Sequence, residues 1–140
     1  MGCIFSTQND IVIPKSKNIK TKHILYLEDM EIHYDLLRLV MQKYTKDEIV
    51  LHWATNSTDA KKLLDENHID GMIVDRRLGD ELGENFVKYV LDNKLFDPKK
   101  IIILSALSEN DDVKCLIDTG VKYMQKPMDI IVFKEYVNEI

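Results

Sequence analysis

Acidic side chains stand directly after two short apolar segments. Residues 24–27 are followed by Glu28 and Asp29, and residues 72–74 are followed by Asp75. A single acidic residue in such a place is more often a turn or capping residue than a chemical group. Three carboxylates together would instead suit Mg²⁺, which prefers oxygen ligands, and a carboxylate can act as a nucleophile that forms an aspartyl phosphate.

Two further polar residues follow later apolar segments. Ser105 comes after residues 101–104, and Lys126 comes shortly after residues 121–124. A lysine ammonium supplies a point charge for a phosphate, and a serine hydroxyl can donate to a phosphoryl oxygen. If these groups meet the three carboxylates, the set suits Mg²⁺-assisted phosphoryl transfer to a carboxylate.

The elements that carry these residues alternate in type along the chain. Five short apolar segments read as strands and alternate with amphipathic, helical stretches: residues 24–27, 49–53, 72–74, 101–104 and 121–124. Such alternation predicts a parallel sheet with helices on both faces. In an open sheet of this kind, function lies beyond the carboxyl ends of the strands, where all the polar residues above are expected.

Apolar periodicity predicts which helix faces are buried. In the first helix the apolar residues recur at i, i+4, i+7 and i+8, which predicts a buried face made of Ile32, Leu36, Leu39 and Val40. Ser57 precedes the next periodic stretch and is the expected N-cap of the second helix.

Composition indicates an ordinary single domain of 140 residues, with 31% charged and 45% hydrophobic residues. The net charge of -5 offers no bulk attraction to nucleic acid or anionic membranes. No apolar run could span a bilayer and the start does not resemble a secretory signal, so the cytoplasm is the expected compartment. Cysteine and histidine spacing indicates neither a disulfide framework nor a histidine metal site, and we interpret the histidines as isolated: Cys3, Cys115, His23, His33, His52 and His68.

Four segments together resemble a response-regulator receiver domain over about residues 22–140. They are ILYLED at 24–29, GMIVDRRLGDELG at 71–83, IIILSAL at 101–107 and GVKYMQKP at 120–127. The resemblance implies an α/β, (βα)5 flavodoxin-like three-layer sandwich. Its central five-stranded parallel sheet would have the strand order 2-1-3-4-5.

The resemblance also implies a phosphorylatable switch of a two-component or phosphorelay system. Asp75 would accept a phosphoryl group from a sensor histidine kinase or a histidine phosphotransfer protein. Mg²⁺ would be held by Asp29, by Asp75, by the backbone carbonyl of Arg77 and, mostly through water, by Glu28. The chain would catalyse its own phosphoryl transfer and autodephosphorylation rather than a metabolic reaction.

The remaining family positions concern the response to phosphorylation. Ser105 would move toward the phosphoryl group, Lys126 would pair with it, and Tyr123 matches the switch aromatic. The output surface would be the fourth helix, the fifth strand and the fifth helix, acting on a downstream protein target. The chain departs from the family pattern at Gly79, where a proline is common, which should loosen that loop.

Other interpretations stay open at this stage. Arg76 and Arg77 are simplest as solvated charges, although the Arg77 side chain could reach over the acidic pocket. The alternative function is a phosphorylation-independent interaction module with the receiver fold. A flavodoxin-like nucleotide binder would need a glycine-rich phosphate loop after the first strand, which is missing.

The two ends of the chain carry expectations of their own. Residues 1–21 exceed what a receiver needs and should form a packed arm or an extra edge strand, centred on residues 10–14. The start fits the Met-Gly-x-x-x-Ser acylation pattern, but membrane association is not expected. The chain stops at the last helix, which is expected of a stand-alone receiver that acts by protein contact or as a phosphorelay intermediate, and equally of a longer chain cut at its C-terminus. No binding of nucleic acid is expected.

Overall fold

The computed structural model describes residues 19–106 and 111–140, so the expected N-terminal arm and the acylation pattern lie outside the described residues. In that part of the chain, no helix combines the length and apolar character needed to cross a membrane. The elements in chain order are β1 (Thr21–Leu27), α1 (Glu31–Tyr44), β2 (Glu48–Ala54), α2 (Ser57–Glu66), β3 (Gly71–Asp75), β4 (Arg77–Leu78), β5 (Glu81–Leu82), α3 (Gly83–Asp92), the 3-10 turn Pro98–Lys100, β6 (Ile101–Ser105), α4 (Asp111–Ile117), β7 (Lys122–Gln125) and α5 (Ile130–Glu139).

The five long strands form one parallel sheet in the order β2-β1-β3-β6-β7. This is the predicted order 2-1-3-4-5, because β4 and β5 pair only with each other in an antiparallel ribbon outside the main sheet. The predicted (βα)5 flavodoxin-like fold is therefore confirmed, and the small ribbon in the connection after β3 is an addition to it.

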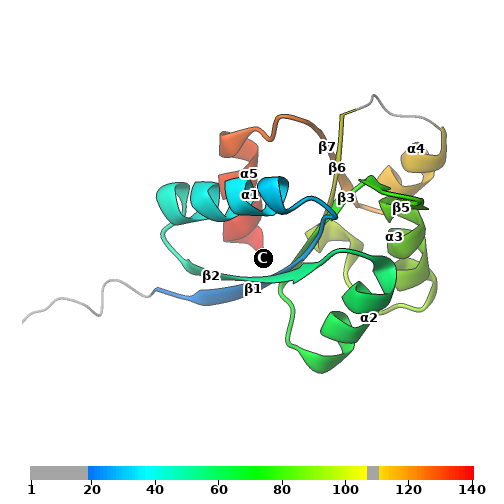
Figure 1. Ribbon diagram of the computed structural model, residues 1–140, viewed down its shortest axis with the longest axis horizontal. Coiled ribbons are helices and arrows are strands. Elements are labelled where there is room, and N and C mark those ends of the chain that lie inside the picture. The colour runs from blue at the N-terminus through cyan, green and yellow to red at the C-terminus, as the bar shows by residue number, and fades with distance from the viewer. Residues whose placement is uncertain (1–18, 107–110) are drawn as a thin grey trace, which may run out of the picture.

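The helices cover both faces of the sheet, as Figure 1 shows: α1 and α5 lie on one side, and α2, α3 and α4 on the other. The central strands β3 and β6 are buried at every position, because both of their faces are covered. Alternate residues of each strand enter two separate apolar cores, one on each face. Packing on both faces holds each strand in position, and with it the residue at its carboxyl end.

The helix α1 turns a different face inward from the one predicted. Ile32, Leu36 and Leu39 are 57%, 55% and 53% exposed, whereas Leu37 and Met41 are buried. Apolar residues lie on more than one face of α1, so the apolar spacing in the sequence is compatible with two different buried faces. The face that carries Leu37 and Met41 packs against the sheet, and the predicted face stays at the surface.

The N-cap of α2 also differs from the prediction by one residue. The side chain of Asn56 accepts a hydrogen bond from the backbone N–H of Asp59 at 2.9 Å, and Ser57 is the first helical residue. Asparagine is as good an N-cap as serine, so the sequence around residues 56 and 57 allows either start.

The connection after β3 brings backbone close to backbone. A Cβ atom on Gly83 would lie 2.0 Å from the carbonyl oxygen of Asp75, so only glycine fits there. The backbone N–H of Gly83 donates to the carbonyl of Arg76 at 2.7 Å. Gly79, at the tip of the ribbon, has φ of +62°, which glycine adopts without strain. The start of α3 is thus pinned against the end of β3, and this holds Asp75 in place.

Candidate functional site

The carboxyl ends of the central strands surround one cavity of about 570 Å³. All the polar residues singled out at strand ends, except Glu28, line it directly. The lining is formed by Asp29, Met30, His33, Asp75, Arg76, Arg77, Gly79, Ser105, Ala106 and Lys126. The fold therefore brings together residues that are almost 100 positions apart in the chain, as the alternation of strands and helices predicts.

Asp75 is the last residue of β3 and is 6% exposed. Its Oδ1 atom lies 3.1 Å from the Nζ atom of Lys126. The backbone N–H of Lys126 donates to the carbonyl of Ser105 at 2.7 Å, and this bond fixes the backbone position of Lys126 directly after β7. A carboxylate held at the floor of an open cavity, with a cation beside it, can act on a phosphorus that enters from solvent.

Glu28 lies behind the cavity and is fully buried. Its carboxylate accepts hydrogen bonds from the Tyr26 hydroxyl at 3.3 Å, the Met30 backbone N–H at 3.1 Å and His33 Nδ1 at 3.1 Å. Burial, and next the negative charge of Asp75, raise the pKa of Glu28 above its usual range. The carboxylates at this site thus repel one another, and a cation would relieve that repulsion.

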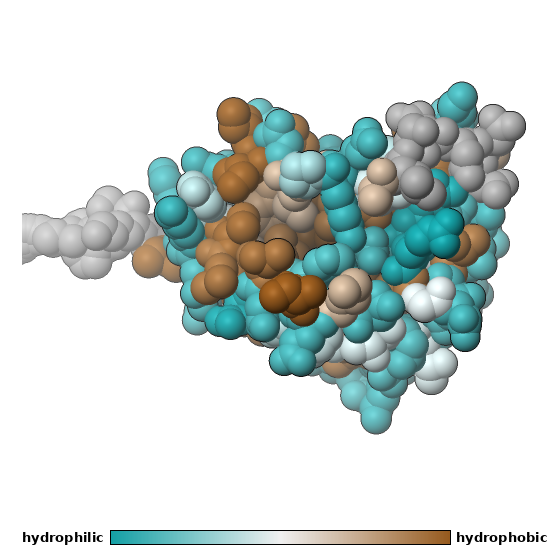
Figure 2. Space-filling view, turned by 45° about the horizontal axis from the view of Figure 1, so that its top comes forward, coloured by the Kyte–Doolittle hydropathy of each residue, from teal (hydrophilic) through white to brown (hydrophobic). Residues whose placement is uncertain are grey.

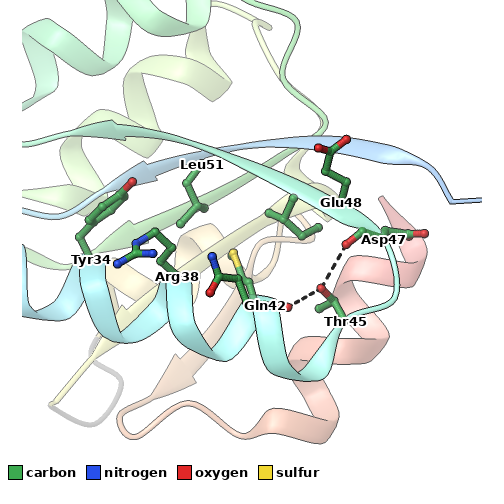
Figure 3. A pocket seen from close by; sticks show the side chains of 9 residues that line it. Tyr34, Arg38, Gln42, Thr45, Asp47, Glu48 and Leu51 are labelled. Carbon is green, nitrogen blue, oxygen red and sulfur yellow. Dashed lines mark hydrogen bonds between the residues drawn. The ribbon is translucent and has the colours of Figure 1, made fainter.

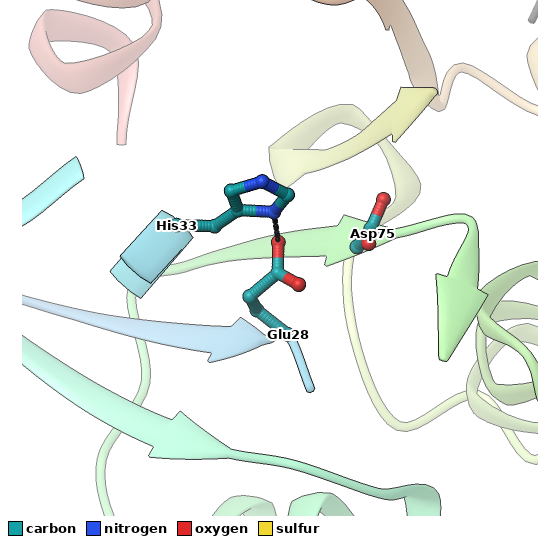
Figure 4. Close-up of side chains that lie close together, drawn as sticks. All are labelled: Glu28, His33 and Asp75. Carbon is teal, nitrogen blue, oxygen red and sulfur yellow. Dashed lines mark hydrogen bonds and ion pairs between the residues drawn. The ribbon is translucent and has the colours of Figure 1, made fainter. Parts of the chain in front are cut away.

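The side chains available for such a cation include one that sequence analysis missed. Ligand atoms of Glu28, His33 and Asp75 all lie within 4.8 Å of one another, with His33 reaching in from the first turn of α1 (Figure 4). Asp29 is exposed and borders the same cavity. Two carboxylates at one opening, Asp29 and Asp75, with Glu28 buried behind them, fit a hard divalent cation. The position of His33, in the first turn of the helix that follows Glu28 and Asp29, was the signal that could have identified it.

The two arginines after Asp75 differ in burial and in what their side chains contact. Arg76 is only 7% exposed, and its Nε atom lies 2.5 Å from the Oε1 atom of Glu84 in α3. Its interpretation as a solvated charge is wrong, because the turn after β3 directs it inward to this partner. The hydrogen bond to Glu84 raises the pKa of Arg76, and Tyr123 adds to this effect. Arg77 is exposed and borders the cavity.

The two residues expected to respond to phosphorylation lie on neighbouring strands. Ser105 ends β6, is 3% exposed and lines the cavity. Tyr123 in β7 is half-buried, pairs in register with Ile103 and packs against the core on the α3 side. Since Arg76 interacts with Tyr123 and directly follows Asp75, the chain offers a physical connection from the acceptor position to β7.

A second cavity, of about 340 Å³, lies between α1 and β2, away from the strand ends (Figure 3). Polar groups line it, among them Arg38, Gln42 and Asp47. Asp47 pairs with Lys22 at 3.1 Å, and Thr45 donates a hydrogen bond to the Met41 carbonyl at 2.6 Å. Asp47 and Thr45 thus have partners within the fold, and this cavity lies apart from the strand-end site.

A family model described as the response regulator receiver domain matches residues 24–138. A comparison with curated proteins found no match. The matched segment contains every strand-end residue discussed above, from Glu28 to Lys126.

Solved structures share the fold at low sequence identity. The receiver domain of Francisella response regulator 1452 has a TM-score of 0.67 at 22% identity, covering 84% of this chain and 94% of that one. A response regulator from Thermotoga maritima has a TM-score of 0.66 at 21% identity, with 85% and 96% covered. A Burkholderia pseudomallei response regulator with a phosphorylated aspartic acid, a calcium ion and citrate has a TM-score of 0.67 at 20% identity, with 80% and 64% covered.

Proposed function

Since this chain belongs to the response regulator receiver domains, and is therefore a phosphorylatable signalling switch of two-component systems, we propose that Asp75 accepts the phosphoryl group. The observation that carries this proposal is the place of Asp75. It ends the central strand β3, opens into the strand-end cavity, and lies 3.1 Å from Lys126.

The proposed reaction is transfer from a phosphohistidine. A carboxylate oxygen of Asp75 attacks the phosphorus, an O–P bond forms and the P–N bond of the donor breaks. The electron pair of that bond returns to the donor imidazole. Lys126 neutralises charge on the phosphoryl oxygens, and the Ser105 hydroxyl donates to one of them after a small movement.

The residues that would hold Mg²⁺ are Asp29, Asp75 and the backbone carbonyl of Arg77, with Glu28 acting through water. Bound Mg²⁺ would neutralise charge on the transferring group and orient it toward the acceptor. The Burkholderia structure, with its phosphorylated aspartic acid and calcium ion, supports a divalent cation beside the acceptor by analogy. The raised pKa of Glu28 supports it from this chain's own residues, because the charge of Asp75 contributes to that shift after burial, and a cation would offset this repulsion.

The proposed phosphoryl donor is a histidine kinase or a phosphotransfer protein that docks on α1. An apolar groove of about 310 Å³ lies between α1 and the start of α5, and His33 and Lys126 border both this groove and the strand-end cavity. Exposed apolar side chains on and next to α1 continue the surface, within the brown area over α1 and α5 in Figure 2: Met30, Ile32, Leu36 and Leu39. An apolar helical surface carrying a phosphohistidine would fit there.

The proposed output uses α4, β7 and α5. Movement of Ser105 toward the phosphoryl group would vacate space at the end of β6, and Tyr123 on the neighbouring strand would move with it. A downstream protein would read the changed surface. A partner that binds the phosphorylated conformation modestly more tightly than the unphosphorylated one would shift the population toward it.

The test is incubation with a small acyl-phosphate donor, with and without Mg²⁺, followed by intact mass measurement. We expect one phosphoryl adduct that requires Mg²⁺, none on Asp75→Ala, and a normal adduct on Asp80→Ala. Asp80 is the matched control because it is an exposed aspartate in the same connection. An adduct on Asp75→Ala would contradict the assignment, and no adduct on the wild type would favour the phosphorylation-independent interaction module.

A further inference from the structure

Three of the four histidines of this chain lie together, far from the strand-end cavity. His23 belongs to β1, His52 to β2, and His68 to the connection between α2 and β3. Their interpretation as isolated residues is wrong, because the pairing of β1 with β2 brings together residues that the sequence separates. His68 precedes β3, whereas the strand-end cavity follows it, so this cluster is a separate site.

The first two imidazoles already lie at almost the distance of a chelating pair. The Nδ1 atom of His23 is 2.9 Å from the Nε2 atom of His52. Two nitrogens bound to one tetrahedral Zn²⁺ at about 2.0–2.1 Å are roughly 3.3 Å apart. An ion in place of the shared proton would need the rings to separate by a few tenths of an ångström and also to tilt, because the ring centroids, 5.2 Å apart, leave the two nitrogens pointing almost at each other, whereas a tetrahedral ion lies off the line between its ligands.

The third imidazole carries the support that metal-bound histidines usually have. The Nε2 atom of His68 lies 2.7 Å from Oδ1 of Asp70, and the other oxygen of Asp70 accepts the backbone N–H of His23 at 2.8 Å. A carboxylate that accepts the outer N–H of a ligating imidazole is the common partner in metal sites. When the Nε2–H of His68 donates to Asp70, the neutral ring has its lone pair on Nδ1, which is then the atom that can bind a metal.

The remaining distance is within reach of a side-chain rotation. The ring centroids of His23 and His68 are 6.1 Å apart, and the rings meet edge to face at 75°. The His68 side chain is 77% exposed, so the core does not oppose its movement, and its contact with Asp70 is kept when the Asp70 side chain follows the ring. Exposed side chains change rotamer within nanoseconds.

We propose that His23, His52 and His68 form a binding site for a borderline transition-metal ion such as Zn²⁺, with Asp70 orienting His68. Imidazole ligands select such ions, whereas the carboxylates of the strand-end cavity suit Mg²⁺. Burial, and then the neighbouring His23, lower the pKa of His52, which favours the neutral ring that a metal requires. The ring that donates the shared hydrogen bond moves its proton to its other nitrogen, so no proton is lost.

Calorimetric titration of Zn²⁺ into the full chain tests this site. The protein carries no histidine tag and is kept in excess Mg²⁺, which fills the strand-end cavity. We expect one Zn²⁺ per chain with a dissociation constant in the micromolar range, weakened at least about tenfold in both His52→Gln and His68→Ala. Glu66→Gln, an exposed substitution at the end of α2, is the matched control and should bind Zn²⁺ like the wild type.

The location is checked with Co²⁺, which shifts the NMR signals of nearby imidazole protons. We expect large shifts for His23, His52 and His68 and none for His33. Because the His68 side chain is exposed, His68→Ala should fold normally even if His52→Gln does not, and thermal melting verifies both. Absence of Zn²⁺ binding, wild-type affinity in His68→Ala, or Co²⁺ shifts centred on His33 would each overturn the proposal. None of these outcomes bears on phosphorylation at Asp75.

Discussion

Lys126 and Asp75 form a 3.1 Å ion pair across the strand-end cavity, and the same ammonium lies 3.8 Å from Glu28. Lys126 therefore partly compensates the charge of Glu28, whose ionised form is disfavoured first by burial and then by the negative charge of Asp75. If Asp75 accepts a phosphoryl group as proposed, we expect the lysine to take that group as its new partner. Its position couples the charge in the cavity to the end of β7.

Replacement of Lys126 by alanine should leave the nucleophile in place but interrupt the response. We expect Lys126→Ala to take up a phosphoryl group from a small acyl-phosphate donor, while the amide signals of α4 and β7 fail to shift in NMR spectra. The reason is that Lys126 contacts the charge at Asp75 and directly follows β7. The control is Lys122→Ala in β7, which removes an exposed ion pair with Glu139 of α5 and should switch normally. Normal α4 and β7 shifts in Lys126→Ala would contradict this role.

The pKa of Glu28 leads to a prediction for the metal-free protein. A carboxyl group whose pKa is raised by folding stabilises the fold below its unfolded pKa, and that contribution is lost as the pH rises through the folded pKa. Glu28→Gln cannot ionise, so in EDTA it should melt a few degrees higher than the wild type at about pH 7. The gain should vanish toward about pH 4 and should shrink when Mg²⁺ is added. A melting temperature below that of the wild type at about pH 7 would show that the charged form of Glu28 is stabilising instead.

Asp29 should be required for cation binding. The indole N–H of Trp53 donates to the carbonyl of Glu28 at 2.7 Å, so the fluorescence of this single tryptophan reports on the cavity. Titration with Mg²⁺ should change that fluorescence, and Asp29→Asn should weaken the affinity about tenfold or more, because it removes a charged oxygen ligand. Phosphorylation should weaken in parallel. Unchanged affinity in Asp29→Asn would remove this residue from the ligand set.

The buried pair Arg76–Glu84 should be a strong determinant of stability. Their side chains are 9% and 1% exposed and lie 2.5 Å apart. Removing one partner of a buried ion pair leaves an uncompensated charge, so Arg76→Met should lower the free energy of unfolding by about 3–5 kcal/mol. Urea unfolding measures this, with Arg77→Met as the exposed control. The double variant Arg76→Met/Glu84→Leu should recover most of the loss, and equal losses in single and double variants would contradict the pairing argument.

The strands and the strand-end residues could be predicted because their signals are local. A continuous apolar run such as residues 101–104 reads as a buried parallel strand, and the fold places the residue after it at the functional edge. Asp75, Ser105 and Lys126 all lie where that reasoning puts them. Their chemical roles remain predictions until the phosphorylation tests are made.

What the sequence did not reveal depends on distant contacts. Arg76 is buried because its partner Glu84 lies beyond an unpredicted ribbon, on a different element. His23 and His52 meet only because β1 and β2 pair with Leu25 opposite His52. The buried face of α1 was misassigned because its apolar residues suit both the sheet and the surface groove. In each case, pairing or packing between elements decides the outcome, and local periodicity has no access to it.

Arg77 should control how long the phosphoryl group persists. Its side chain is exposed and borders the cavity that holds Asp75, and the chain turns there into the short strand β4. After phosphorylation, a long cationic side chain at this opening would lie near a dianionic group and near the line along which water attacks the phosphorus. An exposed ion pair contributes only about 0–1 kcal/mol, so the melting temperature of Arg77→Ala should hardly change. A barrier lowered by about 1.4 kcal/mol is nevertheless a tenfold faster reaction, so loss of phosphate from Asp75 should be several times faster in the variant. The measurement is the decay of phosphoprotein after the donor is removed, with Arg77→Lys, which keeps the charge, as the control. An equal or slower decay in Arg77→Ala would mean that Arg77 is a solvated charge with no part in protecting the phosphoryl group.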